Sequence, residues 1–238
     1  MIQSALQGLM GSVHTCADAP RAALIETGDF LFLAGDAADM QCETLLAPYA
    51  HDGRFRILCC KDQALYDRAG QLLRGAASPA QRFAFQMPEK FDRQKLDAMI
   101  RKAPDDVQLR LFDAGCYDQA MKSEWSRDLC SQFASKDHYL ENGLGAAALC
   151  DGQLIGGASS YIYAQGAIEI EIDVRSDQRR RGIASACAAM LVLECLKRGI
   201  RPGWDAANPV SARLAEKLGY VPLGAYPVWL LHEQAALE

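Results

Sequence analysis

The sequence has no long hydrophobic run, no leader-like start and no cysteine motif. No apolar stretch approaches the roughly 20 residues of a membrane-spanning helix, and the start, MIQSALQGLMGSVH, has neither a basic segment nor a long apolar one. The nine cysteines form no CxxC motif and no Cys/His pair at metal-ligand spacing. We therefore expect reduced cysteines that serve as small core residues, a cytoplasmic location, no membrane contact and no metal site.

The chain also lacks a surplus of positive charge. Its 25 Lys and Arg face 30 Asp and Glu, a formal net charge of −5. General nucleic-acid binders usually carry a basic surplus, so we expect no nucleic-acid partner and an anion site only where cations gather locally. The P-loop pattern GxxxxGK[ST] and the dinucleotide fingerprint GxGxxG are absent as well. The length of 238 residues allows one large domain or two small ones.

The first 104 residues predict a small α/β region. Short aromatic or β-branched runs indicate strands, and the segments between them have helical spacing. The expected strands are 30–35, 54–60 and 82–87, and the expected helices are 38–50 and 62–73. A charged amphipathic helix over 90–106 follows and should stop near Pro104. We place the domain boundary there, which divides the chain into 1–104 and 105–238.

The second region predicts the order strand, helix, three meandering strands, helix, strand, helix, strand. The turn Asp151-Gly152 lies between apolar runs, which is a hairpin signal. In AIEIEIDV (167–174), apolar and acidic residues alternate strictly, so one face should be buried and the other wet. The expected elements are strand 107–115, helix 117–134, strands 143–150, 153–163 and 167–174, helix 183–198, strand 201–207, helix 208–220 and a final strand from 221.

Three arginines and a glycine, Arg179-Arg180-Arg181-Gly182, precede the apolar helix. A helix begins with unpaired backbone N–H groups and a partial positive charge, and it therefore attracts anions. Gly182 has no Cβ, and Ala184 leaves space along the first turn, so a ligand can approach the backbone. The turn could cradle a diphosphate, although RRRG alone is more often a solvated basic turn.

With these elements placed, residues 105–238 resemble the GNAT superfamily of acyl-CoA-dependent N-acyltransferases. The family signature Q/R-x-x-G-x-G/A fits residues 179–184, and Val174 stands at the expected spacing before it. Asn208, Ser211, Leu214 and the run 217–220 match the family's N-x-x-S-x-x-L-x-x-K-L-G-F/Y stretch. The run PGWDAANPVSARLAEKLGY and the extra N-terminal region look more narrowly like a two-domain group that includes zwittermicin-resistance-type acetyltransferases.

The resemblance implies an α/β (α+β) fold with a mixed, centrally splayed β-sheet flanked by helices. The smaller N-terminal α/β region would shape the acceptor site. Acetyl-CoA would be the cosubstrate, with its pantetheine arm on the edge of the strand carrying Val174 and its diphosphate on the amides of 179–184. Asn208 and Ser211 would contact the arm or simply cap the second helix. The implied cofactor-binding residues are Val174, Arg179, Arg180, Arg181, Gly182, Ile183, Ala184, Asn208 and Ser211.

The implied reaction is attack of a primary amine, expected on a small molecule, on the acetyl thioester. A lysine-like amine has a pKa near ~10.4 in water and needs help to lose its proton. Glu171 is our first choice for the base and Glu169 the second, because both share the wet face of the strand with Asp173. These acids could instead form a solvated edge or a pocket that merely attracts a cationic amine. Backbone N–H near Val174 could stabilise the oxyanion.

The sequence departs from the family pattern at Ala215. Many GNAT enzymes have a tyrosine there that protonates the leaving thiolate, so the acid stays open between Tyr226, Tyr161, Tyr163 and water. The departure keeps a rival interpretation, an acyl-CoA-binding module that has lost catalysis and serves as a sensor or partner.

Four further residues have an expected place but no assigned chemistry. Tyr220, Trp204 and Trp229 are expected to pack in the core. His138, in a loop, faces either solvent or the acceptor cleft.

Overall fold

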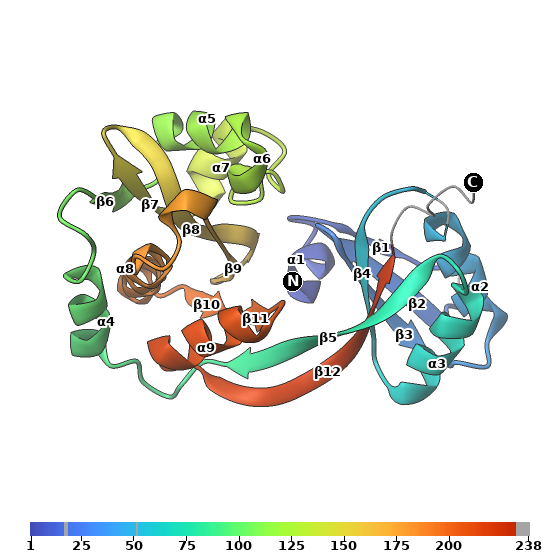
Figure 1. Cartoon of the computed structure of the whole chain (residues 1–238). Coiled ribbons are helices and arrows are strands. Elements are labelled where there is room, and N and C mark those ends of the chain that lie inside the picture. Colours follow the sequence, from blue (N-terminus) through green and yellow to red (C-terminus); the bar gives the residue numbers. More distant parts are fainter. Residues whose placement is uncertain (17–18, 51, 232–238) are drawn as a thin grey trace. The chain divides into compact units, whose positions relative to one another are not determined.

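The computed structural model describes residues 1–16, 19–50 and 52–231, and its contacts divide the chain into two compact units (Figure 1). The first unit comprises Met1–Arg82 and the chain from Ala225 onward, and the second unit is Phe83–Gly224. The contacts thus group residues 83–104 with the second unit, whereas the sequence suggested a boundary at 104. The physical reason is that helix α4 (Arg93–Ile100) packs against helix α8 (Ile183–Arg198).

The first unit is a sheet covered by helices, as the sequence predicts for this region. Neighbouring strands follow the order β1-β2-β3-β4-β12, in which β3 and β4 are parallel and the other pairs antiparallel. The strands are β1 (Ser12–His14), β2 (Ala22–Thr27), β3 (Phe30–Gly35), β4 (Arg56–Cys60) and the last part of β12 (Val221–Leu231). The helical segments are α1 (Ile2–Leu6), α2 (Met40–Leu46), η1 (Ala47–Tyr49) and α3 (Gln63–Leu72). Of these elements, α1, β1 and β2 were not expected.

The second unit contains a five-stranded mixed sheet of order β10-β9-β8-β7-β6. Its strands are β6 (Gln108–Leu111), β7 (Gly145–Cys150), β8 (Gln153–Ala164), β9 (Ala167–Val174) and β10 (Arg201–Gly203). Only β10 runs parallel to its neighbour β9, and the remaining pairs are antiparallel. Asp151 and Gly152 both have positive φ, 49° and 75°, which is the geometry of the predicted hairpin turn.

Helices cover both faces of this sheet (Figure 1). Two successive glycines of β8 show the two layers: a Cβ on Gly156 would meet Ile183 of α8, whereas one on Gly157 would meet Leu129 and Phe112. The second face carries α5 (Ala114–Lys122), α6 (Glu124–Arg127) and α7 (Lys136–Asn142). The apolar residues of β9 pack on the α8 side, which confirms the predicted buried face. The acidic face is half-buried and not wet, because α6 packs against β9.

Three predictions about helical segments need correction. The helix expected over 117–134 is divided into α5 and α6, because Ser123 adopts an extended backbone (φ −120°, ψ 137°). The segment 135–142 forms helix α7, with the Ser135 side chain accepting a bond from the N–H of His138, whereas we expected a loop. The helix expected over 90–106 is confined to α4, which Asp92 caps.

The sheet opens between β9 and β10. Their pairing runs only from Arg201↔Ala167 to Gly203↔Glu169. Beyond Trp204 the chain forms β11 (Asp205–Ala206), which pairs with β5 (Ala77–Gln86), so the single strand expected over 201–207 is two strands with different partners. Among residues 1–16, 19–50 and 52–231, no strand therefore pairs with the second half of β9 on that side, which confirms the centrally splayed sheet.

Core predictions are confirmed for several residues. All nine cysteines are free and six are buried. Trp204 and Tyr220 are buried, and the Tyr220 hydroxyl donates to the Pro202 carbonyl at 3.0 Å. Helix α9 (Pro209–Leu218) begins at the predicted Asn208 cap. Within the described ranges, no helix has both the length and the apolar character to cross a bilayer.

Candidate functional site

The unpaired half of β9 exposes backbone polar groups on one side. Amides of successive strand residues point alternately to the two sides of the strand. The Arg175 amide donates to the carbonyl of Ile155, near the start of β8. The amides of Val174 and Ile172 therefore point away from β8, toward the opening. Side chains satisfy these groups: Asp173 Oδ1 accepts from Val174 N at 2.7 Å, and Glu171 Oε1 accepts from Ile172 N at 3.1 Å. The open edge of β9 (residues 170–174) is therefore closed by its own acids and not by a strand.

The open edge leads through the 3-10 turn η2 (Ser176–Gln178) to the N-terminus of α8. Arg180 (φ 65°) and Gly182 (φ 85°) adopt left-handed conformations there. The first amide of the turn with an intrahelical partner is Ala186, which donates to Gly182. In the part of the chain that the structure describes, the amides of residues 180–185 have no acceptor. These donors form a cradle at the positive end of a 16-residue helix, which suits an anion.

The three arginine side chains have different partners. Arg181 Nη2 donates to both carboxylate oxygens of Asp106, at 2.6 and 2.8 Å, and this ion pair lowers the pKa of the Asp106 carboxyl. Arg179 Nε donates to the Val174 carbonyl at 3.1 Å. Arg180 is exposed, and among the described residues its guanidinium has no partner. Arg181 and Arg179 are thus held by protein groups, whereas Arg180 is an exposed cation at the cradle, and ligand binding by any of the three stays a prediction.

Asn208 and Ser211 have structural partners. Asn208 Oδ1 accepts from the amides of Val210 and Ser211, both at 3.0 Å. Ser211 Oγ lies 3.3 Å from Trp204 Nε1, which donates to it. The capping alternative fits these contacts, and cofactor binding by either side chain stays a prediction.

The acids of β9 lie on the face opposite α8. Glu171 pairs in register with Ser159, and Glu169 lies over Gly203, where a Cβ would come within 2.6 Å of its Oε2. Asp173 is half-buried, and burial raises the pKa of its carboxyl. The structure therefore places Glu169 and Glu171 on one face of β9, with Glu171 in the open edge and Glu169 at the last pair with β10, and their catalytic roles stay predictions. Asp173 shares this face, as the alternation predicts, but its bond to the Val174 amide depends on the side-chain conformation, which alternation does not determine.

His138 and Tyr163 form a pair on the α7 side. His138 Nδ1 accepts from the Ala134 amide at 3.3 Å, so in the neutral ring the proton sits on Nε2, which lies 3.1 Å from the Tyr163 hydroxyl. Phe133 stacks on Tyr163 with ring centroids 5.7 Å apart. His138 lies in helix α7 and is half-buried, so it is not the loop residue that the sequence suggested.

The other candidates for the acid differ in their surroundings. Tyr161 is buried, and Ala215, at the position of the family's usual tyrosine, is fully buried. Tyr226 belongs to the first unit.

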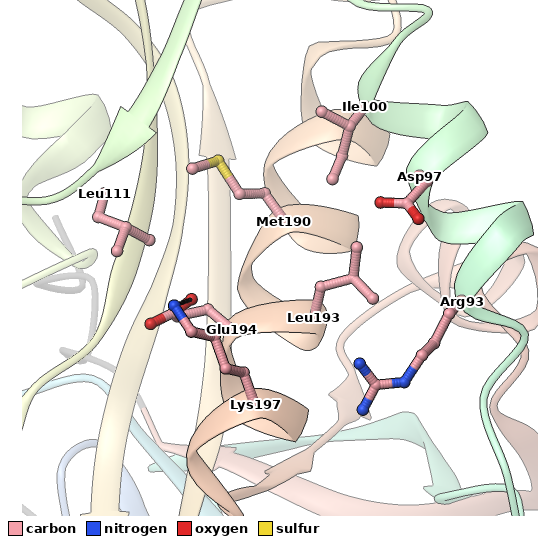
Figure 2. A pocket seen from close by; sticks show the side chains of 8 residues that line it. All are labelled: Arg93, Asp97, Ile100, Leu111, Met190, Leu193, Glu194 and Lys197. Carbon is pink, nitrogen blue, oxygen red and sulfur yellow. Dashed lines mark ion pairs between the residues drawn. The ribbon is translucent and has the colours of Figure 1, made fainter.

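A separate hollow of about 330 Å³ lies between α4, α8 and β6 (Figure 2). Figure 2 shows an apolar floor with charged side chains at its rim. The lining residues are Arg93, Asp97, Ile100, Leu111, Met190, Leu193, Glu194 and Lys197. Those on α8 begin seven residues after Ile183, about 10 Å along the helix at ~1.5 Å per residue, so the hollow is distinct from the cradle.

A splayed strand edge that runs into an anion cradle at a helix N-terminus is the arrangement of an acyl-CoA-dependent transferase. The chain belongs to the GNAT acetyltransferase family, whose family model matches residues 1–229. The match includes the first unit, although no family motif was identified in residues 1–104 of the sequence. The narrower resemblance to zwittermicin-resistance-type enzymes stays a prediction.

Solved structures support the same family. A GCN5-related N-acetyltransferase-like protein from Streptococcus suis is 35% identical, with a TM-score of 0.90 over 97% of this chain and 92% of that one. GCN5-related N-acetyltransferases from Kribbella flavida (17% identity, TM-score 0.61, 99% and 96% of the two chains) and Sphaerobacter thermophilus (16%, 0.51, 89% and 76%) share the fold. No curated protein sequence matches this chain.

Proposed function

We propose that this protein transfers the acetyl group of acetyl-CoA to a primary amine of a small molecule. The observation that carries the proposal is the continuity of donors: the edge amides of Ile172 and Val174 lead directly to the amides of 180–185. The GNAT family supports acyl transfer from acetyl-CoA in general. The amine and its small size are our own extension.

Different parts of the site would bind different parts of acetyl-CoA. The amides of the cradle and the Arg180 guanidinium would hold the diphosphate, because helix N-termini and arginine both favour phosphate oxygens. The pantetheine arm would lie along the open edge of β9 in the place of a partner strand, and its amide groups would pair with the backbone groups of that edge. Edge N–H groups would then lie beside the thioester, where they could stabilise the oxyanion.

The reaction forms one C–N bond and breaks one C–S bond. The neutral amine attacks the thioester carbonyl, the tetrahedral intermediate collapses, and the thiolate leaves. The amine loses a proton to a base and the thiolate gains one, so no oxidant or reductant is needed. The acidic face of β9 suits a cationic amine before deprotonation.

Glu171 is the proposed base, and Glu169 stands beside it as the second choice. Replacing Glu171 with Gln keeps its size and removes its basicity, so turnover should fall at least tenfold while CoA affinity changes little. Steady-state rates across pH measure the effect, with Glu216→Gln on exposed α9 as the matched control. Unchanged rates in the Glu171 variant at every pH would remove it from the mechanism.

The acid that protonates the thiolate is proposed among Tyr163, Tyr161, Tyr226 and water. Tyr163 is favoured among the tyrosines because it is only half-buried, unlike Tyr161, and its oxygen accepts from Nε2–H of His138. A thiolate with a pKa near ~8.5–10 also leaves without much help, so loss of this tyrosine should slow the reaction only modestly.

A second candidate function follows from Ala215, which fills the place of the family's usual tyrosine. In this alternative the protein binds acyl-CoA without catalysis, as a sensor or partner. A thiol-release assay with acetyl-CoA and a panel of amines separates the two. Amine-dependent thiol release supports the enzyme, whereas tight cofactor binding without release supports the binding module.

A further inference from the structure

We infer that Asp173 competes with acyl-CoA for the backbone N–H of Val174 and thereby sets the affinity of the protein for the pantetheine arm. The inference rests on the proposed function, because it assumes that the arm lies along the open edge of β9. It adds an internal competitor, built into the same strand, that the ligand must displace.

The contacts of Val174 carry the inference. Asp173 Oδ1 accepts from the Val174 amide at 2.7 Å, and Arg179 Nε donates to the Val174 carbonyl at 3.1 Å. Arg179 Nη2 also lies 3.9 Å from Asp173 Oδ1. The two side chains therefore bond both backbone polar groups of Val174, its N–H and its carbonyl, on the side of β9 where β10 no longer pairs.

The competitor has a physical reason to exist. The side chain of Val174 is buried in the core, so an edge N–H left bare beside it would be a poorly solvated donor. The carboxylate supplies a charge-assisted bond, which is stronger than a neutral one. An arm carbonyl that takes over this N–H must first move the carboxylate away, and it gains only the difference between the two bonds.

The surroundings of Asp173 favour its release. Its carboxyl faces Arg179 from the cradle loop and Asp128 from the α6 side, and burial raises its pKa. A carboxylate that burial disfavours loses little when it turns toward water. Glu171 makes the same contact with Ile172, but it is the proposed base, so Asp173 is the cleaner residue to test.

The test compares two variants of the full chain by calorimetric titration with CoA. Asp173→Ala removes the charge and the acceptor, whereas Asp173→Asn removes the charge but keeps an acceptor oxygen in place. The Kd of CoA should be roughly 3- to 10-fold lower in the alanine variant than in the asparagine variant. Loss of negative charge near the diphosphate alone would tighten both variants equally.

ADP serves as the control ligand, because it carries a diphosphate and no pantetheine arm. It should bind the two variants equally, which also shows that both are folded around the cradle. Equal Kd values for CoA in the two variants, or weaker binding to the alanine variant, would overturn the inference and leave the proposed function standing. Failure of CoA to bind the unaltered protein would overturn both.

Discussion

The two units place charged side chains in opposite situations. In the first unit, Arg56 is buried, with Nη2 3.3 Å from Glu26 and 3.5 Å from Asp52. The Tyr49 hydroxyl donates to Glu26, and burial together with that carboxylate raises the pKa of Tyr49 to about 12. We call these four residues the closed cluster. In the second unit, the cradle keeps amides without acceptors and the exposed Arg180.

The difference separates charges that hold the fold from charges that serve a ligand. In the closed cluster the opposite charges lie within the same unit, so the cation and its acids stabilise one another. In the cradle, Arg181 and Arg179 have partners, but in the described part of the second unit the amides of 180–185 and the Arg180 guanidinium have none. Composition does not reveal this contrast, since arginine is present in both places.

The largest expected effect is on the closed cluster. Arg56→Met should lower the free energy of unfolding by about 3 kcal/mol, because it leaves the carboxylates of Glu26 and Asp52 without their buried cation. Urea denaturation measures the change. CoA affinity of the folded protein should be unchanged.

Arg21 is the matched control, since it pairs with Asp36 and Asp39 on the surface. Its replacement with Met should cost about 0–1 kcal/mol. If the Arg56 and Arg21 variants had the same free energy of unfolding, burial of the closed cluster would not add to stability, and the contrast would fail.

An intermediate effect, of opposite sign for stability, is expected in the cradle. Arg180→Gly should raise the free energy of unfolding by about 1 kcal/mol, because glycine adopts the left-handed conformation without strain. The same change should weaken CoA binding roughly tenfold through loss of a charge-assisted bond. Thermal denaturation and calorimetry measure the two quantities.

Asp151→Gly is the stability control for Arg180, because Asp151 has a similar φ of 49° in the hairpin turn between β7 and β8. It should stabilise the protein similarly. An unaltered Kd in the Arg180 variant would mean that the cradle uses its amides only.

The smallest effect is expected at Asn208. Asn208→Ala should cost about 1 kcal/mol of stability through loss of the cap. Asn208→Asp keeps the accepting oxygen and should cost less. If the side chain only caps α9, CoA affinity stays the same in both variants, whereas weaker binding in both would support the cofactor contact that the family resemblance implies.

Local signals predicted much of the second unit. The bounds of α8 and β9 match the sequence expectation, because a capping Gly199 and strict alternation are properties of neighbouring residues. The change of partner at Trp204 was not predictable, since it depends on which strand each segment meets in three dimensions.

The candidate site follows the same rule. The positions of Glu169, Glu171 and the cradle amides followed from periodicity and from the position of the helix start. The partner of Arg181, by contrast, lies 75 residues away at Asp106, and no local pattern connects them. The break at Ser123 and the helix at 136–142 were also missed, because tertiary packing competes with weak helical spacing there.

The course of the chain through β5 and β12 bears on how this protein can be dissected. The division between the units falls inside both strands, at Arg82 and Ala225. Trp229 near the end of β12 donates to the Tyr66 carbonyl at 2.9 Å and stacks on the Tyr66 ring, and Leu230 pairs with Ile57 of β4. A clone truncated at residue 104 would thus omit a strand and an aromatic anchor of the unit it was meant to isolate. A circularly permuted gene that joins 225–231 to residue 1 would keep them.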